Sequence, residues 1–170
     1  PQRQRRRRQH LPATRRRALD DGVHRFPSSD TTASTDTALA PGLYIVATPI
    51  GNLGDISPRA LAVLAGASLI ACEDTRVTGK LLHYFNISTR MMPYHDHNAA
   101  RVRPALIARA LAEPVALVSD AGTPLISDPG CKLVAEARAA GVTIVTIPGP
   151  SAVIAALSIA GLPTDRFLFA

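Results

Sequence analysis

The sequence has little of several things, and each shortage excludes a class of protein. Only 4% of its 170 residues are aromatic and tryptophan is absent, but 46% are hydrophobic, which suffices for one ordinary core. No stretch approaches the roughly 20 uninterrupted apolar residues of a membrane helix. The N-terminal arginines lack the apolar core of a secretory signal. We therefore expect a cytoplasmic protein that is not embedded in a membrane.

Two cysteines, Cys72 and Cys131, lie far apart and outside any paired spacing such as C-x-x-C. A zinc site or a disulfide framework thus has little support, and we predict that the chain holds no metal. Both cysteines are predicted to be small residues in or near the core. The sequence also lacks G-x-G-x-x-G and G-x-x-x-x-G-K-[ST], which argues against common dinucleotide-binding proteins and P-loop nucleotide hydrolases.

The net charge of +6 is concentrated near the N-terminus. Residues 1–40 contain nine of the 19 Lys and Arg residues but only four of the 13 Asp and Glu residues. Arginine clusters precede a run of Ser, Thr, Asp and Ala at 28–38, so we predict a disordered tail over 1–40. This tail either neutralises RNA phosphates or is a solvated extension without a binding role.

From residue 41 onward, short apolar runs alternate with helical runs rich in alanine and leucine. This pattern predicts an α/β domain over 41–165, with an open, mainly parallel five-stranded sheet flanked by helices. The apolar run at 166–170 is expected to begin a segment leading to a second domain that this chain lacks. The predicted strands are 43–47, 68–71, 89–92, 115–118 and 143–147.

Local signals predict where the helices begin and end. Ser57 is expected to cap a helix that has Pro58 at its first position, and Ser151 to cap a helix that stops at Gly161. Pro104 falls inside a helical pattern that reaches Ala112. Because proline removes a helical hydrogen bond, we expect the regular helix to begin close to Pro104.

Polar residues collect directly after the predicted strands, in the loop at 48–55 and at 73–76, 94–98, 119–128 and 148–151. In an open parallel sheet, ligands bind outside the carboxyl ends of the strands, so these segments should converge on one rim. Glycine amides, small hydroxyls and carboxylates on such a rim would suit a cofactor with an adenosine part and an amino-acid part. S-adenosylmethionine is one such cofactor, but these residue types alone do not distinguish it from others.

Four runs are specific enough for a family resemblance: TPIGNLGDIS at 48–57, CEDTR at 72–76, SDAGTPLISDPG at 119–130 and PGPSA at 148–152. YHDHN at 94–98 and GLPTDRF at 161–167 add support. Together they resemble the 16S ribosomal RNA cytidine-2′-O-methyltransferase family, a branch of the tetrapyrrole-methylase-like methyltransferases. The resemblance covers about residues 42–169.

This resemblance implies a two-domain enzyme that binds S-adenosylmethionine between its domains and usually works as a homodimer. Its substrate would be a cytidine ribose in 16S rRNA of the small ribosomal subunit. The chain departs from the family by its basic tail and by Ala99 and Ala100, where members often carry an acidic residue. It also supplies only the first domain, which leaves open whether it catalyses alone.

The family's most distinctive loop and the run after the last strand provide the predicted cofactor contacts. These are Asp120, Ala121, Gly122, Thr123, Pro124, Ser127, Pro148, Gly149 and Ser151. The alternative is a structural strand-to-helix loop in which Asp128 and Ser151 only cap helices.

Methylation of a ribose hydroxyl requires its oxygen to be aligned and its proton to leave, so a carboxylate or histidine near the rim is needed. The catalytic candidates are Asp74, Glu73 and His95. Arg76 is a candidate for holding phosphate, or for a structural ion pair with Glu73. The other substrate candidates are Tyr94, which either stacks on a base or packs in the core, together with Asp96, Asn98 and Asn52.

Two competing functions remain open. A tetrapyrrole (corrin-type) C-methyltransferase would share the fold and cofactor, but that branch usually has a first loop resembling G-x-G-P-G-D-P, whereas residues 48–55 read TPIGNLGD. The RNA branch is therefore favoured. The arginine-rich tail and the missing half suggest the second alternative, a non-catalytic RNA- or cofactor-binding fragment.

Overall fold

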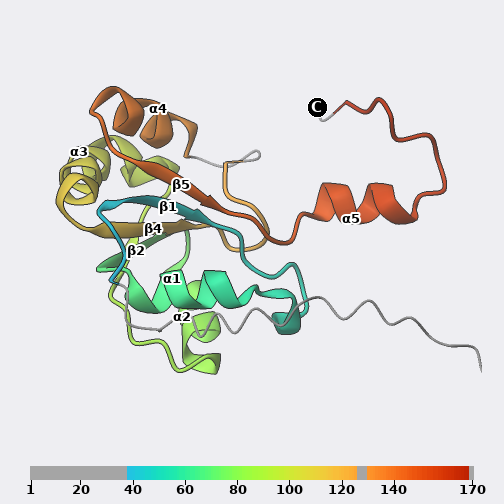
Figure 1. Cartoon of the computed structure of the whole chain (residues 1–170), viewed down its shortest axis with the longest axis horizontal. Coiled ribbons are helices and arrows are strands. Elements are labelled where there is room, and N and C mark those ends of the chain that lie inside the picture. Colours follow the sequence, from blue (N-terminus) through green and yellow to red (C-terminus); the bar gives the residue numbers. More distant parts are fainter. Residues whose placement is uncertain (1–37, 126–129, 169–170) are drawn as a thin grey trace, which may run out of the picture. The chain divides into compact units, whose positions relative to one another are not determined.

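The computed structural model describes residues 38–125 and 130–168, in which five strands form one open sheet (Figure 1). The strand order is β3-β2-β4-β1-β5, and every neighbouring pair is parallel. The predicted α/β class and parallel sheet are confirmed. The strands are β1 (Gly42–Val46), β2 (Leu69–Cys72), β3 (Met91–Pro93), β4 (Pro114–Val118) and β5 (Ile144–Ile147).

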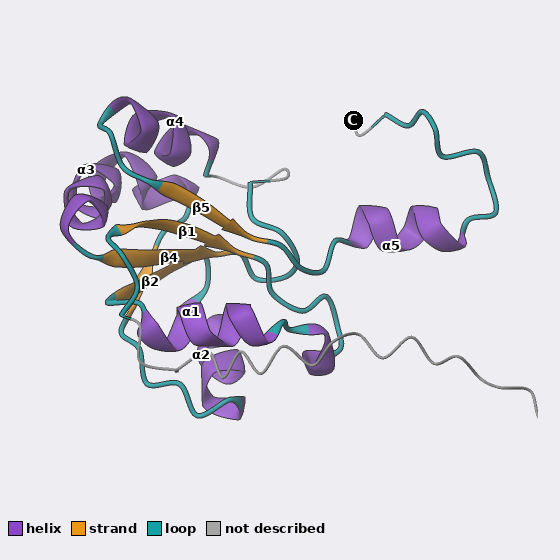
Figure 2. Ribbon diagram, viewed as in Figure 1, coloured by secondary structure: helices purple, strands orange, loops and turns teal. Residues whose placement is uncertain are grey.

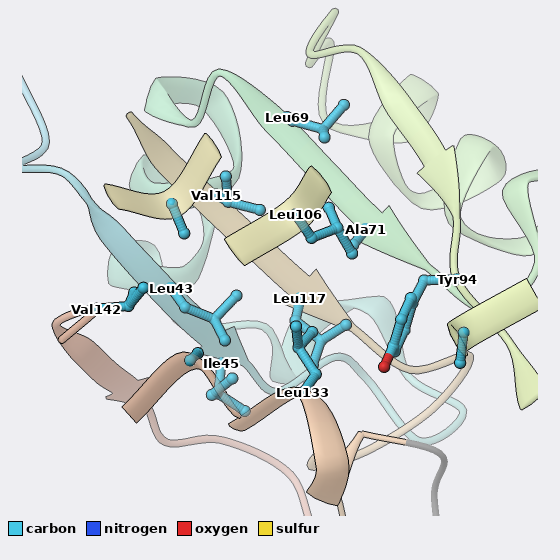
Figure 3. Packing of buried hydrophobic residues seen from close by; sticks show 13 residues of the cluster. Leu43, Ile45, Leu69, Ala71, Tyr94, Leu106, Val115, Leu117, Leu133 and Val142 are labelled. Atoms are coloured by element: carbon cyan, nitrogen blue, oxygen red, sulfur yellow. The ribbon is translucent and has the colours of Figure 1, made fainter. Parts of the chain in front are cut away.

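Helices cover both faces of this sheet (Figure 2). The covering helices are α1 (Pro58–Gly66), α2 (Thr75–Tyr84), α3 (Asp96–Ala112) and α4 (Cys131–Ala139). The other helices are α5 (Ala152–Ile159), which has no buried residue, and a short 3-10 helix, η1 (Leu53–Asp55). Leu64 of α1 and Leu82 of α2 belong to the core cluster on one face. Leu106 of α3 and Leu133 of α4 belong to the cluster on the other face, which Figure 3 shows. The sheet is thus doubly wound, with crevices at the carboxyl ends of its strands.

Strand β1 lies between β4 and β5, and all its residues are buried. Leu43 and Ile45 face the cluster of α3 and α4, whereas Tyr44 and Val46 face that of α1 and α2. This alternation follows from the two-residue period of a strand. Because both faces are covered, the strand is a continuous apolar run rather than an alternating one.

The start of α1 follows the sequence prediction, but the start of α3 does not. Ser57 Oγ accepts a hydrogen bond from Ala60 N at 3.1 Å, with Pro58 in the first turn. Helix α3 begins at Asp96, so the expectation of a start near Pro104 is wrong. The helix start is held by Asn98, whose Oδ1 accepts from His95 N (3.0 Å). Because Pro104 is exposed, its ring disturbs no packing, and the helix continues through it.

The cysteine prediction is half right. Cys72 is buried in β2, but Cys131 is exposed because it occupies the first position of α4, beside the loop. Residues 1–37 of the predicted tail, together with 126–129 and 169–170, lie outside the described residues. No helix in the described residues is both long and apolar enough to span a membrane.

Candidate functional site

The loops that follow β1, β4 and β5 are joined at the carboxyl end of the sheet. Thr48 N donates to Gly122 O at 2.9 Å, and Gly122 N donates back to Thr48 O at 3.1 Å, so the two loops form an antiparallel bridge. Thr123 Oγ1 donates to Pro150 O at 3.1 Å, which joins the β4 loop to the β5 loop. The predicted convergence of these segments on one rim is therefore confirmed.

Glycines allow this close approach. A Cβ atom on Gly149 would lie 2.9 Å from Ala47 Cβ, closer than two carbon atoms can pack. Gly122 has φ +81°, a left-handed conformation that strains other residues. Ala121 and Gly149 are exposed at the surface of the joined loops. Preformed backbone of this kind can approach a bound ligand closely.

The remaining predicted cofactor residues are divided between surface and interior. Asp120 and Pro148 are exposed, whereas Pro124 is buried. Ser151 stands at the N-cap position of α5 but makes no side-chain hydrogen bond to the helix, so the alternative of a capping role has no support. Ser127, like Asp128, lies outside the described residues.

Asp74 connects the loop after β2 to the same rim. Its backbone N donates to Asp120 Oδ1 at 3.2 Å. Its carboxylate caps α2 by accepting from Arg76 N at 2.8 Å and forms an ion pair with Arg76 Nη2 at 2.6 Å. Arg76 therefore pairs with Asp74 at this rim. Hydrogen bonds from the Arg76 side chain and backbone lower the pKa of Asp74 to about 2.

A polar hollow of about 720 Å³ brings the catalytic candidates together. His95 is half-buried and lines this hollow together with Asp74. Its imidazole is therefore a candidate for substrate contact. The hollow is lined by Glu73, Asp74, Thr75, Arg76, Pro93, His95 and Asp120.

Tyr94 is buried rather than available for stacking. Its exposed fraction is 3%, and its ring belongs to the core cluster that includes Leu117 and Leu133 (Figure 3). The ring faces are therefore covered by protein, which favours the packing role over the stacking role. Burial raises the pKa of its hydroxyl, and the neighbouring Arg103 side chain opposes this rise. Tyr94 also lines a smaller hollow of about 250 Å³ with Glu73 and Pro124.

The other substrate candidates do not join the polar hollow. Asn98 Nδ2 donates to Pro93 O at 2.9 Å, so Asn98 supports the segment that carries His95. Asp96 lines a separate hollow with Arg103 and Lys132, between α3 and α4. Asn52 Oδ1 accepts from Gly54 N at 3.0 Å and thus caps η1. Asn98 and Asn52 therefore have structural roles in this fold.

The sequence prediction missed an apolar hollow of about 560 Å³ between the β1 loop and α2. Val77 and Lys80, three residues apart on α2, lie on its border, and Leu53 of η1 lies there too. Helical spacing could have identified the first two as neighbours. The full lining comprises Thr48, Pro49, Leu53, Val77, Thr78, Lys80, Leu81, Ser119 and Asp120. Among the described residues, no three His, Cys, Asp or Glu side chains cluster as metal ligands would.

Known proteins match this chain over the same region. Residues 42–168 fit the family model described as tetrapyrrole (corrin/porphyrin) methylases. Ribosomal RNA small subunit methyltransferase I from Vibrio cholerae is 61% identical over 131 residues, which cover 76% of this chain and 46% of the relative. The protein of the same name from Mesorhizobium japonicum is 58% identical over 133 residues, covering 78% and 45% of the two chains.

Solved structures share the fold. The crystal structure of uroporphyrin-III-C-methyltransferase from Thermus thermophilus matches with a TM-score of 0.56 and 25% identity, over 75% of this chain and 55% of that one. The chain spans about half the length of the curated relatives it matches. The family resemblance inferred from the sequence is confirmed. Since the family model covers most of its residues, the chain belongs to the tetrapyrrole (corrin/porphyrin) methylase family.

Proposed function

We propose that this chain is the S-adenosylmethionine-binding part of a methyltransferase that modifies the 2′-hydroxyl of a cytidine in small-subunit (16S) rRNA. The observation that carries the proposal is the joining of the β1, β4 and β5 loops through Thr48, Gly122, Thr123 and Pro150. The two curated relatives named above are ribosomal RNA small subunit methyltransferases, which supports RNA as the substrate. The proposed enzyme acts in the cytoplasm as a homodimer on the small ribosomal subunit.

The joined loops fit the proposed cofactor. When bound, S-adenosylmethionine supplies an electrophilic methyl group attached to a sulfonium. The exposed residues Ala121 and Gly149 would lie against it, and Gly149 has no side chain to keep its backbone away. Thr123 would hold the β4 loop against Pro150. The predicted set of contacts is retained as part of this proposal: Asp120, Ala121, Gly122, Thr123, Pro124, Ser127, Pro148, Gly149 and Ser151.

The polar hollow would receive the ribose and its phosphate. The residues that line this hollow would align the 2′-oxygen and accept its proton when the bound cofactor supplies the methyl group. Asp74 is a poor proton acceptor at neutral pH because Arg76 keeps its pKa at about 2. The imidazole of His95 lines the same hollow, and histidine is the side chain most often used as a general base. We therefore propose that His95 accepts this proton, with Glu73 as the second candidate for the proton acceptor. Arg76 would contact the phosphate.

Cofactor binding is tested by titrating S-adenosylmethionine into the 170-residue chain by calorimetry. Thr123→Val removes the hydrogen bond to Pro150 O, and we expect it to weaken binding about fivefold or more. Thr89→Val is the matched control, since Thr89 Oγ1 donates to Leu64 O at 2.7 Å, away from the joined loops. Equal affinities in all three proteins would contradict the proposed cofactor site.

Methyl transfer is tested in a chimera, because the chain spans about half of its relatives. Residues 42–168 replace the matching part of the Vibrio cholerae protein, and labelled methyl transfer to small ribosomal subunits is measured across pH. We expect His95→Gln to lower the rate at least about 100-fold and to change the pH profile. Transfer to uroporphyrinogen III rather than RNA would instead place the chain in the tetrapyrrole-methylating branch.

A further inference from the structure

Helix α2 presents a row of basic and aromatic side chains to solvent. Arg76, Lys80 and Tyr84 are four residues apart, so they lie on successive turns of one helix face. All three are exposed, whereas Thr78 and Leu82 on the opposite face of the helix are buried. We call Arg76, Lys80 and Tyr84 the α2 stripe. At 1.5 Å of rise per residue, the stripe is about 12 Å long.

The first residue of the α2 stripe connects it to the reaction site. Arg76 lines the polar hollow together with His95, and its side chain is 87% exposed. Its side-chain bonds to Asp74 use Nε and Nη2, whereas Nη1 bonds to none of the described residues. Arg76 can therefore still donate to a phosphate oxygen. Because α2 begins directly after β2, the stripe leads from the hollow over the surface of the domain.

The segment that carries the α2 stripe is basic. Residues 75–90 contain Arg76, Lys80 and Arg90 but no Asp or Glu. The rest of 41–170 contains seven Lys and Arg residues against nine Asp and Glu residues. Lys80 has no ion pair in the described part of the chain, whereas two arginines of α3 pair with glutamates. Positive charge on α2 is therefore available to a polyanion such as an RNA backbone.

The stripe ends at an exposed aromatic ring. Tyr84 is 62% exposed, whereas Tyr44 and Tyr94 are 7% and 3% exposed. The Tyr84 ring packs against the half-buried Phe85 in an edge-to-face arrangement, with 4.9 Å between the ring centroids. This contact supports the ring while most of its surface stays in water. An exposed aromatic ring beside cationic groups is suited to stacking on an unpaired base.

We infer that the α2 stripe binds the RNA strand that continues from the target nucleotide, a role that rests on the proposed function. Arg76 contacts the phosphate at the reaction site, and Lys80 contacts a phosphate further along the strand. Tyr84 stacks on an unpaired base beyond it. The phosphate contacts supply affinity without reading the sequence. The stripe therefore selects a single-stranded segment, because bases within a duplex are already stacked on one another.

The inference is tested by binding a single-stranded RNA of about 12 nucleotides to the 170-residue chain, followed by fluorescence anisotropy at several salt concentrations. Lys80→Gln should weaken binding and reduce the slope of log affinity against log salt by about 0.7, which corresponds to one lost phosphate contact. Tyr84→Leu should weaken binding about fivefold or more without changing the slope, since it removes stacking but no charge. Tyr84→Phe should bind like the parent.

A matched variant controls for the loss of charge. Arg138→Gln removes an exposed positive charge from α4, which packs on the other face of the sheet. The N-terminal arginines are present in every protein compared, so they cannot account for a difference between variants. An effect of Lys80→Gln no larger than that of Arg138→Gln would overturn the inference. So would unchanged RNA affinity in Tyr84→Leu.

The chimera separates this inference from the proposed function. With small ribosomal subunits as the substrate, Tyr84→Leu should raise the KM for RNA about fivefold or more. Its affinity for S-adenosylmethionine should be unchanged, since Tyr84 is not among the residues that line the polar or the apolar hollow. RNA methylation with the parent's KM in this variant would refute the α2 stripe alone. Failure of the unsubstituted chimera to methylate RNA would refute the proposed function and, with it, the role of α2.

Discussion

Asp74 is held ionised by its neighbour Arg76, with consequences for stability at low pH. The folded pKa of about 2 lies below the ordinary aspartate value of 3.8. Folding is therefore favoured by the ionised carboxylate above about pH 4, and this contribution disappears as the pH falls through about 2. The ion pair with Arg76 also fixes the start of α2 at the rim.

Replacing Asp74 by asparagine tests this charge effect, because asparagine can still accept the capping hydrogen bond from Arg76 N. We expect the variant to unfold at lower urea concentration than the parent at about pH 5. The difference should shrink progressively towards about pH 2. Urea titrations followed by circular dichroism at several pH values measure it. A difference that stayed constant over this range would show that the carboxylate charge contributes nothing.

Two glycines should respond to alanine in opposite directions. At Gly149 the new Cβ would lie 2.9 Å from Ala47 Cβ, so we expect a loss of about 1–3 kcal/mol in unfolding free energy from overpacking. At Gly79, inside α2, the nearest atom would be Met91 Cε at 3.5 Å, an ordinary contact. Alanine there should stabilise by about 0.5–1 kcal/mol through helix propensity. Chemical denaturation of both variants checks the pair, and a tolerated Gly149→Ala would contradict the close approach.

Helix α3 carries an internal proline that weakens it. Pro104 cannot donate a backbone hydrogen bond, and its side chain is exposed. Pro104→Ala should therefore restore one helical hydrogen bond without changing the core, and we expect stabilisation of about 1 kcal/mol or more. Denaturant unfolding and far-ultraviolet circular dichroism measure the change. A destabilised variant would mean that the proline ring makes a contact that the helix needs.

The sequence predicted the positions of the strands better than it predicted contacts between side chains. All five strands were placed to within two residues because each is a short, mainly apolar run, and the runs of β1, β2 and most of β4 are buried. The start of α3 was missed because it is held by the Asn98 side chain, which accepts from His95 N and donates to Pro93 O. The spacing of apolar residues does not reveal such side-chain hydrogen bonds. Residue order also could not show that Arg76 pairs with Asp74, since Glu73 and Asp74 both precede it within one turn. The apolar hollow was missed because it joins η1 to a helix from another part of the chain.

Helix α5 differs from the rest of the described molecule in how little it buries. None of its residues is buried, although seven of the eight, AVIAALSI, are apolar. Ile154 is 58% exposed and Ile159 is 86% exposed, and Leu162 beyond the helix is 70% exposed. A helix that is apolar all round is normally covered, and an isolated helix this short is marginal in water. Its stability in this chain therefore depends on a contact that the described residues do not supply.

Hydrogen exchange measured by mass spectrometry tests this dependence. In the 170-residue chain we expect the amides of α5 to exchange orders of magnitude faster than those of β1 and β4, which are paired on both sides. In the chimera with the Vibrio cholerae protein, which is about twice as long as the matched region, α5 should become protected. Measurements at several protein concentrations separate self-association from this effect, since only association would make protection depend on concentration. Strong, concentration-independent protection in the chain alone would show that α5 is stable without a partner.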